Sequence, residues 1–155
     1  MKHYLVIAIV IFAFSFVAVE SAAACSCRYP VGQTDRESVD SAKDEAKAVF
    51  AGRVVKIVKA RDRRGVPLWE QYIAVFEVSE QWKGANKKQI RVSFFAGCCL
   101  CDFRFVKGKR YLVYAYDDGT TLSASVCGRT TETNDPQLEL DRQYLGQPIA
   151  ATPKK

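Results

Sequence analysis

The chain has 155 residues and a net charge of +6, with 23 lysines and arginines against 17 acidic residues. Its one histidine is His3, close to the N-terminus. Ser-His-Asp and Cys-His catalysis both need a histidine, so the composition argues against an enzyme, and most strongly if the N-terminal segment is removed.

The N-terminal segment has the pattern of a secretory signal peptide. A short basic start precedes the apolar residues 4–19 and the small residues 21–24. Such a pattern with an Ala-x-Ala site predicts cleavage between Ala24 and Cys25. We therefore expect residues 1–24 to be a signal peptide and the mature protein to be secreted and extracellular, with no membrane partner after cleavage. The alternative is an uncleaved anchor, although an apolar run of about 16 residues is shorter than the roughly 20 that span a bilayer.

All six cysteines lie after the predicted cleavage site: Cys25, Cys27, Cys98, Cys99, Cys101 and Cys127. An even number of cysteines in a secreted protein predicts disulfides, although six cysteines allow 15 pairings. The alternative is a thiolate metal site around residues 98–101. That segment lacks the C-x2-C spacing of structural zinc sites, so we expect no metal within the protein itself and no cofactor.

The first predicted element is a helix over residues 34–48, which Thr34 or Asp35 can cap. Its apolar stripe consists of Val39, Ala42, Ala46 and Val49, and it is weak because alanine buries little surface. We therefore expect the helix to lie on the outside of a larger body.

Strands are predicted from residue 49 onward. Residues 49–60 are rich in β-branched side chains, with Phe50, Val54 and Val58 in partial alternation. Two further stretches alternate clearly and place these side chains on one face of each strand: Tyr72, Ala74, Phe76 and Val78 in residues 69–82, and Ile90, Val92 and Phe94 in residues 89–95.

The second half of the chain predicts two more strands. Residues 103–109 are expected to connect the cysteine cluster to residues 110–116, which are apolar on both faces, as in a central strand. Asp118-Gly119 indicates a hairpin that leads to a fifth strand over residues 120–126. A short helix is expected at residues 136–144, within a polar C-terminal tail that covers residues 131–155.

Five strands with one or two flanking helices predict a mainly β fold. We expect a small closed barrel, because closure removes the exposed edges of a five-stranded sheet; an antiparallel sandwich is the alternative. The mature chain of about 131 residues suffices for one domain with a modest core. We place that domain at residues 25–130.

Several segments together resemble the netrin-like fold, and in particular the inhibitory domain of the tissue inhibitors of metalloproteinases. They are an N-terminal CSC after a signal peptide, FAGRVV, VSEQWKG, CDFRFVKGKRYLVYA and LSASVCGR, which together span roughly residues 25–129. The resemblance implies a five-stranded closed barrel of the oligonucleotide/oligosaccharide-binding (OB) type with a disulfide-stapled N-terminus. It also implies the bridges Cys25–Cys101 and Cys27–Cys127.

The chain departs from this family in two respects. Cys98 and Cys99 have no counterpart, so a vicinal bridge, a shuffled pairing and an intermolecular link all remain open. No cysteine lies between Cys27 and Cys98, which excludes the family's third bridge. In addition, we expect residues 131–155 to form a tail and not the family's second domain.

The resemblance implies an inhibitor of zinc-dependent endopeptidases whose mature N-terminus enters the target's active site. The free amino group and the carbonyl oxygen of Cys25 would chelate the target's zinc and replace its bound water. Ser26 would face the pocket beside the zinc. The other residues expected to contact the cleft are Cys27, Arg28, Tyr29 and Pro30.

Two other functions remain open from the residues themselves. The first is a secreted netrin-like binding or adaptor module, in which the cysteines only attach the N-terminus. The second is a lipoprotein, because Ala22-Ala23-Ala24-Cys25 weakly resembles a lipobox, and lipidation at Cys25 would abolish chelation. The scattered basic residues are typical of a solvated surface; they would attract an anionic glycan nonspecifically, and we expect no specific nucleic-acid site.

Overall fold

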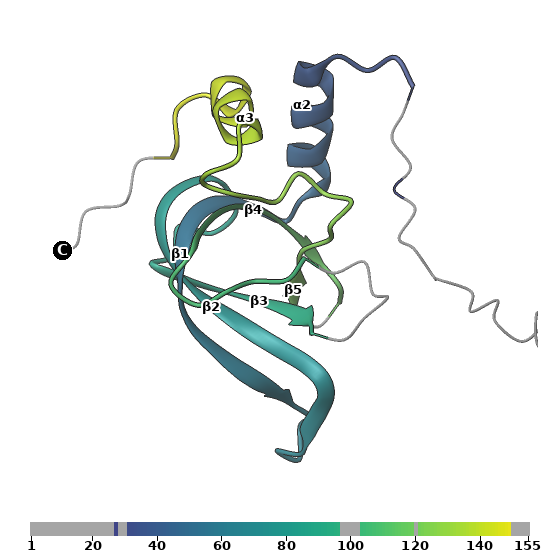
Figure 1. Cartoon of the computed structure of the whole chain (residues 1–155), viewed down its shortest axis with the longest axis vertical. Helices are drawn as coiled ribbons and strands as arrows, with labels where there is room; N and C mark the ends of the chain where they lie inside the picture. Colours follow the sequence, from purple (N-terminus) through teal and green to yellow (C-terminus); the bar gives the residue numbers. More distant parts are fainter. Residues whose placement is uncertain (1–26, 28–30, 97–102, 120, 150–155) are drawn as a thin grey trace, which may run out of the picture.

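The computed structural model describes residues 27, 31–96, 103–119 and 121–149 (Figure 1). Helices and strands follow one another as α2 (Asp35–Glu45), β1 (Ala48–Arg61), β2 (Pro67–Lys83), β3 (Gln89–Phe95), β4 (Arg110–Asp117), β5 (Leu122–Ser123), β6 (Thr131–Glu132) and α3 (Gln137–Leu145).

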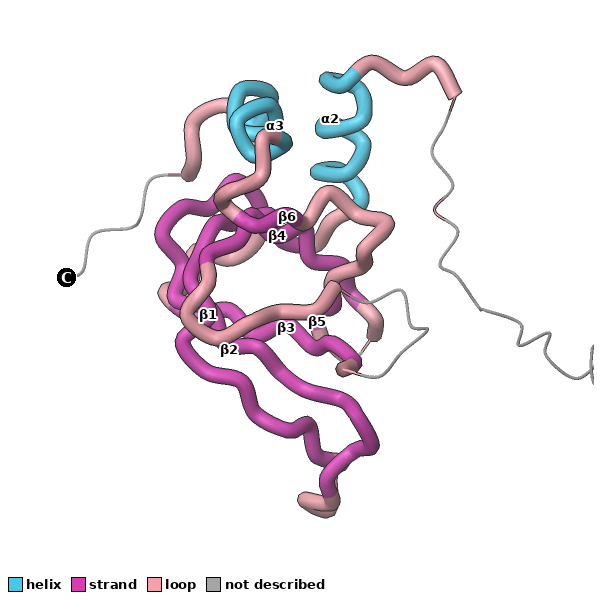
Figure 2. The backbone as a smooth tube through the Cα atoms, viewed as in Figure 1, coloured by secondary structure: helices cyan, strands magenta, loops and turns pink. Residues whose placement is uncertain are grey.

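Five of the strands close into a ring, in the order β1-β2-β3-β5-β4 (Figure 2). Neighbours in the ring are antiparallel except β3 and β5, which are parallel, and the pairing of β1 with β4 closes it. The predicted fold class is confirmed: the protein is mainly β, its five strands close on themselves, helices flank them, and a disulfide attaches Cys27. The closure excludes the sandwich alternative.

Strand β1 can pair with two neighbours because it bends at β-bulges. Its first six residues, 48–53, pair with β4, while its register with β2 shifts at four points along its length. One bulge leaves Val55 without a partner in β2. The extra residue exchanges the two faces of the strand for the side chains that follow. As a result Ile57, and not the predicted Val58, packs against the ring interior.

The interior of the ring is filled by aromatic side chains that meet edge to face. Phe76 lies at the centre, with ring centroids 5.3 Å from Phe50 and 4.9 Å from Phe105. The predicted inward faces of the second and third strands are confirmed. Phe103 and Phe105 come from the segment expected to be only a connector, so this segment is part of the core.

A second apolar layer lies outside the ring, between β1, β4 and the two helices (Figure 1). Val39 of α2 and Leu138 and Leu145 of α3 pack there against Leu112 and Tyr114 of β4. Helix α2 starts at the predicted cap: the Glu37 backbone N–H donates to Thr34 Oγ1, and the Thr34 N–H donates to the Glu37 carboxylate.

Three elements differ in extent from their predictions. The helix predicted over residues 34–48 ends at Glu45, since the backbone is extended at Ala46 and β1 begins at Ala48. The fifth strand is much shorter than predicted, with only Leu122 and Ser123 in β5, because the chain turns again at residues 125–128. Residues 131–149, predicted to form a polar tail, are packed against the ring: β6 pairs with β4, and α3 covers the outer layer.

Candidate functional site

The candidate site is the start of the predicted mature protein, residues 25–30, which we call the N-terminal segment from here on. Cys27 is its described member. Cys27 forms a disulfide with Cys127, with an S–S distance of 2.02 Å and a Cα–Cα distance of 5.1 Å. Cys25, Ser26, Arg28, Tyr29 and Pro30 lie outside the described residues. The same holds for Cys98, Cys99 and Cys101, and therefore for the expected Cys25–Cys101 bridge.

Cys127 itself lies in a tight turn after β5. The Cys127 backbone N–H donates to Ser125 Oγ at 3.1 Å, and the Gly128 N–H donates to the Ser125 carbonyl at 3.1 Å. A Cβ atom at Gly128 would lie 3.2 Å from the Tyr116 ring, so only glycine fits without displacing that ring. The turn is therefore packed closely onto β4.

The next residue, Arg129, holds this segment to both helices. Its guanidinium donates to the Asp141 carboxylate of α3 through Nε at 3.1 Å and through an Nη atom at 2.5 Å, and to Ser38 Oγ of α2 at 2.9 Å. Tyr114 Oη of β4 donates to the same carboxylate at 3.0 Å. One carboxylate thus joins the segment after Cys127 to a helix and to the ring.

This cluster is largely buried, which governs its electrostatics. Asp141 is fully buried, and the Arg129 side chain is 17% exposed. Burial raises the pKa of Tyr114, and the negative charge of Asp141 raises it further. Burial alone would lower the pKa of Arg129, but its hydrogen bonds to Asp141 and the charge of that carboxylate raise it. Arg129 therefore stays positively charged across the physiological pH range.

The described residues at the beginning of the chain are attached at two points, Cys27 and Ser38. Cys27 is bonded to Cys127. Arg129, two residues after Cys127, donates a hydrogen bond to Ser38 Oγ near the start of α2. Between these two anchors the described residues 31–34 are exposed, and Val31 is fully so. Both attachments therefore lie within residues 127–129.

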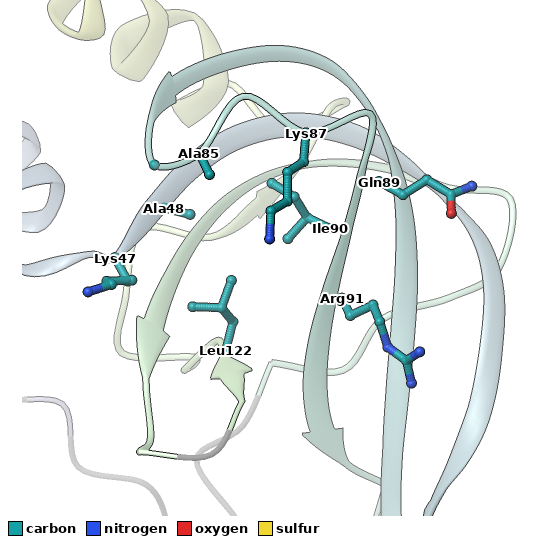
Figure 3. A pocket seen from close by; sticks show the side chains of 9 residues that line it. Lys47, Ala48, Ala85, Lys87, Gln89, Ile90, Arg91 and Leu122 are labelled. Atoms are coloured by element: carbon teal, nitrogen blue, oxygen red, sulfur yellow. The ribbon is translucent and has the colours of Figure 1, made fainter.

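A second candidate site is a pocket of about 400 Å³ at the ring end nearest the helices (Figure 3). Its floor is apolar, formed by Ala48, Ile90 and Leu122, and Lys87 points across it. Lys47 and Arg91 lie at its rim, and none of its lining residues is acidic. The first residues of β3, which line this pocket, extend beyond the stretch that pairs with β5.

Within the described ranges, no group of three or more histidine, cysteine, aspartate or glutamate side chains is arranged to hold a metal ion. No helix in the described part of the chain is long and apolar enough to cross a membrane. No protein-family model matches the sequence, and the curated proteins contain no match.

The residues that the sequence did not single out are Asp141, Tyr114 and Ser38. Arg129 is the last residue of the LSASVCGR segment, and the sequence pattern indicates no role for it. Asp141 is one of many acidic residues, and nothing in its sequence context marks it as buried. Only the packing of α3 against β4 identifies it.

Proposed function

We propose that this protein is a secreted inhibitor of zinc-dependent endopeptidases and not itself an enzyme. After signal cleavage the amino group and the carbonyl oxygen of Cys25 would bind the target's zinc in place of its water. An α-amino group titrates at about 7.7–8.0, so zinc can displace its proton at little cost near neutral pH. Ser26 would face the adjoining pocket, and residues 27–30 would follow the cleft.

The observation that carries this proposal is the disulfide that attaches Cys27, the described residue of this segment, to the body of the protein. An inhibitor that inserts a chain end needs that end to be rigid, since ordering a free segment on binding costs affinity. Cys27 is bonded to a turn that the Arg129–Asp141 pair holds in place. Two residues span at most about 7 Å, so an N-terminus at Cys25 would be tethered close to this anchor.

The decisive experiment compares two mature proteins, one that begins at Cys25 and one with a single extra alanine before it. N-terminal sequencing and intact mass first establish that Cys25 is the first residue, unacylated and oxidised. We expect the first protein to inhibit at least one member of a panel of zinc endopeptidases, and the extended protein to lose inhibition. Equal inhibition by both, or by neither, contradicts the mechanism.

The lipoprotein alternative is decided by the same mass measurement. A lipidated Cys25 would add the mass of its acyl chains and would block the amino group. An unmodified N-terminal cysteine in the secreted protein excludes it.

The pocket at the ring end favours a second candidate function, a binding module for a small anion with an apolar body. Lys47, Lys87 and Arg91 supply positive charge around an apolar floor, which is the usual design of a ligand site. A series of aliphatic carboxylates, titrated while the amide signals of the pocket are followed by nuclear magnetic resonance, tests it. Weaker carboxylate binding by the Lys87→Ser variant supports this function, and unchanged binding refutes it.

A further inference from the structure

The hairpin formed by the far halves of β1 and β2 projects beyond the rest of the protein. The last pair between β2 and β3 joins Gln71 and Phe95, so β2 residues before Gln71 extend past the neighbouring strand. Figure 1 shows the hairpin on the side of the ring opposite α2 and α3. We call residues 61–70 the hairpin tip.

The hairpin tip contains an unusual excursion of the backbone. Lys59 pairs with Tyr72 and Arg61 with Pro67, so one β1 residue, Ala60, lies opposite four β2 residues, 68–71. Within this excursion Glu70 has φ of 51°, the one left-handed non-glycine residue among those described. Such a conformation is unfavourable for a side chain with a Cβ and persists only where the surroundings impose it.

The excursion places an indole in solvent. Trp69, which immediately precedes Glu70, is 82% exposed, and the neighbouring Val66 and Leu68 are 52% and 36% exposed. The Ala96 backbone N–H donates to the Glu70 carbonyl at 2.9 Å, which fixes the base of the excursion to the end of β3. Neither the strained residue nor the exposed indole benefits the isolated fold, so the arrangement points to a contact surface.

The hairpin tip contains three arginines against two acidic residues, Asp62 and Glu70, so its net charge is positive. Asp62 points inward to the turn: its carboxylate accepts from the backbone N–H groups of Arg64 and Val66 at 2.9 and 2.8 Å. It also pairs with Arg64 Nε at 3.2 Å. Arg61 donates to the Gly65 carbonyl at 2.7 Å, and Arg63 is exposed. The turn is therefore preformed and presents arginines beside the apolar side chains.

We propose that the hairpin tip docks onto an anionic lipid bilayer, without spanning it. Trp69, Val66 and Leu68 match the apolar and interfacial layers, where indole rings are favoured, and the arginines match anionic headgroups. A sulfated glycan would pair with the arginines but offers nothing apolar to Val66 and Leu68. This proposal departs from the sequence-based expectation of no membrane partner, because the excursion becomes visible only in the fold. It is independent of Cys25 and of the inhibitor proposal.

The projection of the hairpin suits a flat partner. Since the tip extends past β3, it can touch a planar surface while the ring, the helices and the N-terminal anchor remain clear of it. A hairpin with three apolar side chains gives weak, reversible and salt-sensitive attachment, in contrast to the insertion of a helix.

The two tryptophans of the chain make this proposal measurable with the whole mature protein. Trp82 is 6% exposed, and its Nε1–H donates to the Gly146 carbonyl at 2.7 Å, so its emission already reports a buried indole. The probes are vesicles of phosphatidylcholine alone and of phosphatidylcholine mixed with phosphatidylserine. We expect a blue shift of tryptophan emission, and co-sedimentation, only with the phosphatidylserine vesicles.

Matched variants assign the effect to the hairpin tip. Trp69→Ala should lower vesicle affinity roughly tenfold, because the indole is the largest apolar group of the tip. Arg63→Ala should lower it about fivefold, the usual effect of one basic residue near an anionic surface. The controls are Ile149→Ala, which removes an apolar side chain 48% exposed elsewhere, and Arg36→Ala, which removes a charge from α2.

Three results would overturn the proposal. The first is a lack of binding, or equal binding to both vesicle types. The second is equal binding by Trp69→Ala and Ile149→Ala. The third is the same blue shift with soluble heparin, which would assign the hairpin tip to an anionic glycan.

Discussion

The carboxylate of Asp141 receives the guanidinium of Arg129 at 2.5 Å, and it is the buried link between helix α3 and the segment that carries Cys127. Tyr114 of β4 donates to the same carboxylate at 3.0 Å. Strand β4, the segment that carries Cys127 and helix α3 therefore meet at one charged group.

Replacing this carboxylate should destabilise the protein strongly. Asp141→Asn removes the negative charge and leaves Arg129 buried without a counterion, which we expect to cost roughly 3 kcal/mol. The measurement is the free energy of unfolding in urea. The double variant Arg129→Met with Asp141→Leu, which removes both charges, should cost less than the single change. If the free energy of unfolding of the single variant lies within about 0.5 kcal/mol of the parent, the range of ordinary surface changes, the pair does not contribute to stability.

Removing the disulfide should weaken both stability and inhibition. Cys27 and Cys127 are separated by 100 residues, and the chain-entropy estimate for so long a loop is about 4–5 kcal/mol. We expect the double variant Cys27→Ser with Cys127→Ser to lose about this much in urea unfolding. If the N-terminal segment acts as proposed, inhibition should fall even where the variant is fully folded. Unchanged inhibition by the folded variant would separate the disulfide from the function.

Alkaline pH should destabilise the fold through its buried tyrosines. Burial raises the pKa of Tyr111, Tyr114 and Tyr116 above the usual 10, and nearby carboxylates add to this for Tyr114 and Tyr116. The folded protein then holds these protons more tightly than the unfolded chain does. Their stabilisation is full below about pH 10 and is lost as the pH rises beyond it. Urea unfolding between pH 8 and 11 measures this loss, and Tyr114→Phe should make it shallower; an unchanged slope would contradict the assignment.

Much of the ring could be predicted because alternation along a strand reports which face is buried. The inward residues of β2 and β3 follow that rule without interruption. In β1 the rule failed after Val54, because a bulge at Val55 reverses the alternation. A bulge depends on the register with a partner strand, and one strand read alone does not contain that information.

For the candidate site, the sequence predicted the N-terminal segment itself but not the residues that hold it. The cysteines and the predicted cleavage site mark the N-terminal segment because their chemistry is rare and their spacing is distinctive. The residues that hold the segment, Arg129, Asp141 and Ser38, are of common surface types. They become buried only because α2 and α3 pack side by side over β4, which is a property of the tertiary fold.

Gly52 should tolerate no side chain. A Cβ atom there would lie 2.7 Å from the Glu77 carbonyl oxygen of the paired strand β2, and that atom is backbone and cannot swing away. Gly52→Ala must therefore shift β1 against β2, at a cost of about 1–3 kcal/mol, the usual range for overpacking. Urea unfolding measures the loss. A free energy of unfolding within about 0.5 kcal/mol of the parent, the range of ordinary surface changes, would refute the close approach.

The strained conformation of Glu70 leads us to expect a substitution that increases stability, the opposite of the effect at Gly52. At φ of 51° glycine carries no penalty, whereas glutamate does, so Glu70→Gly should raise the free energy of unfolding by about 1 kcal/mol. The Glu70 carbonyl would still accept from Ala96, since the bond is between backbone groups. The control is Glu77→Gly, a strand residue without positive φ, which should lose stability because glycine is unfavourable there. The same Glu70→Gly protein should bind phosphatidylserine vesicles with unchanged or lower affinity, because glycine lets the excursion around Trp69 move. A stability equal to or below that of the parent would mean that the left-handed conformation at Glu70 is not a strained one.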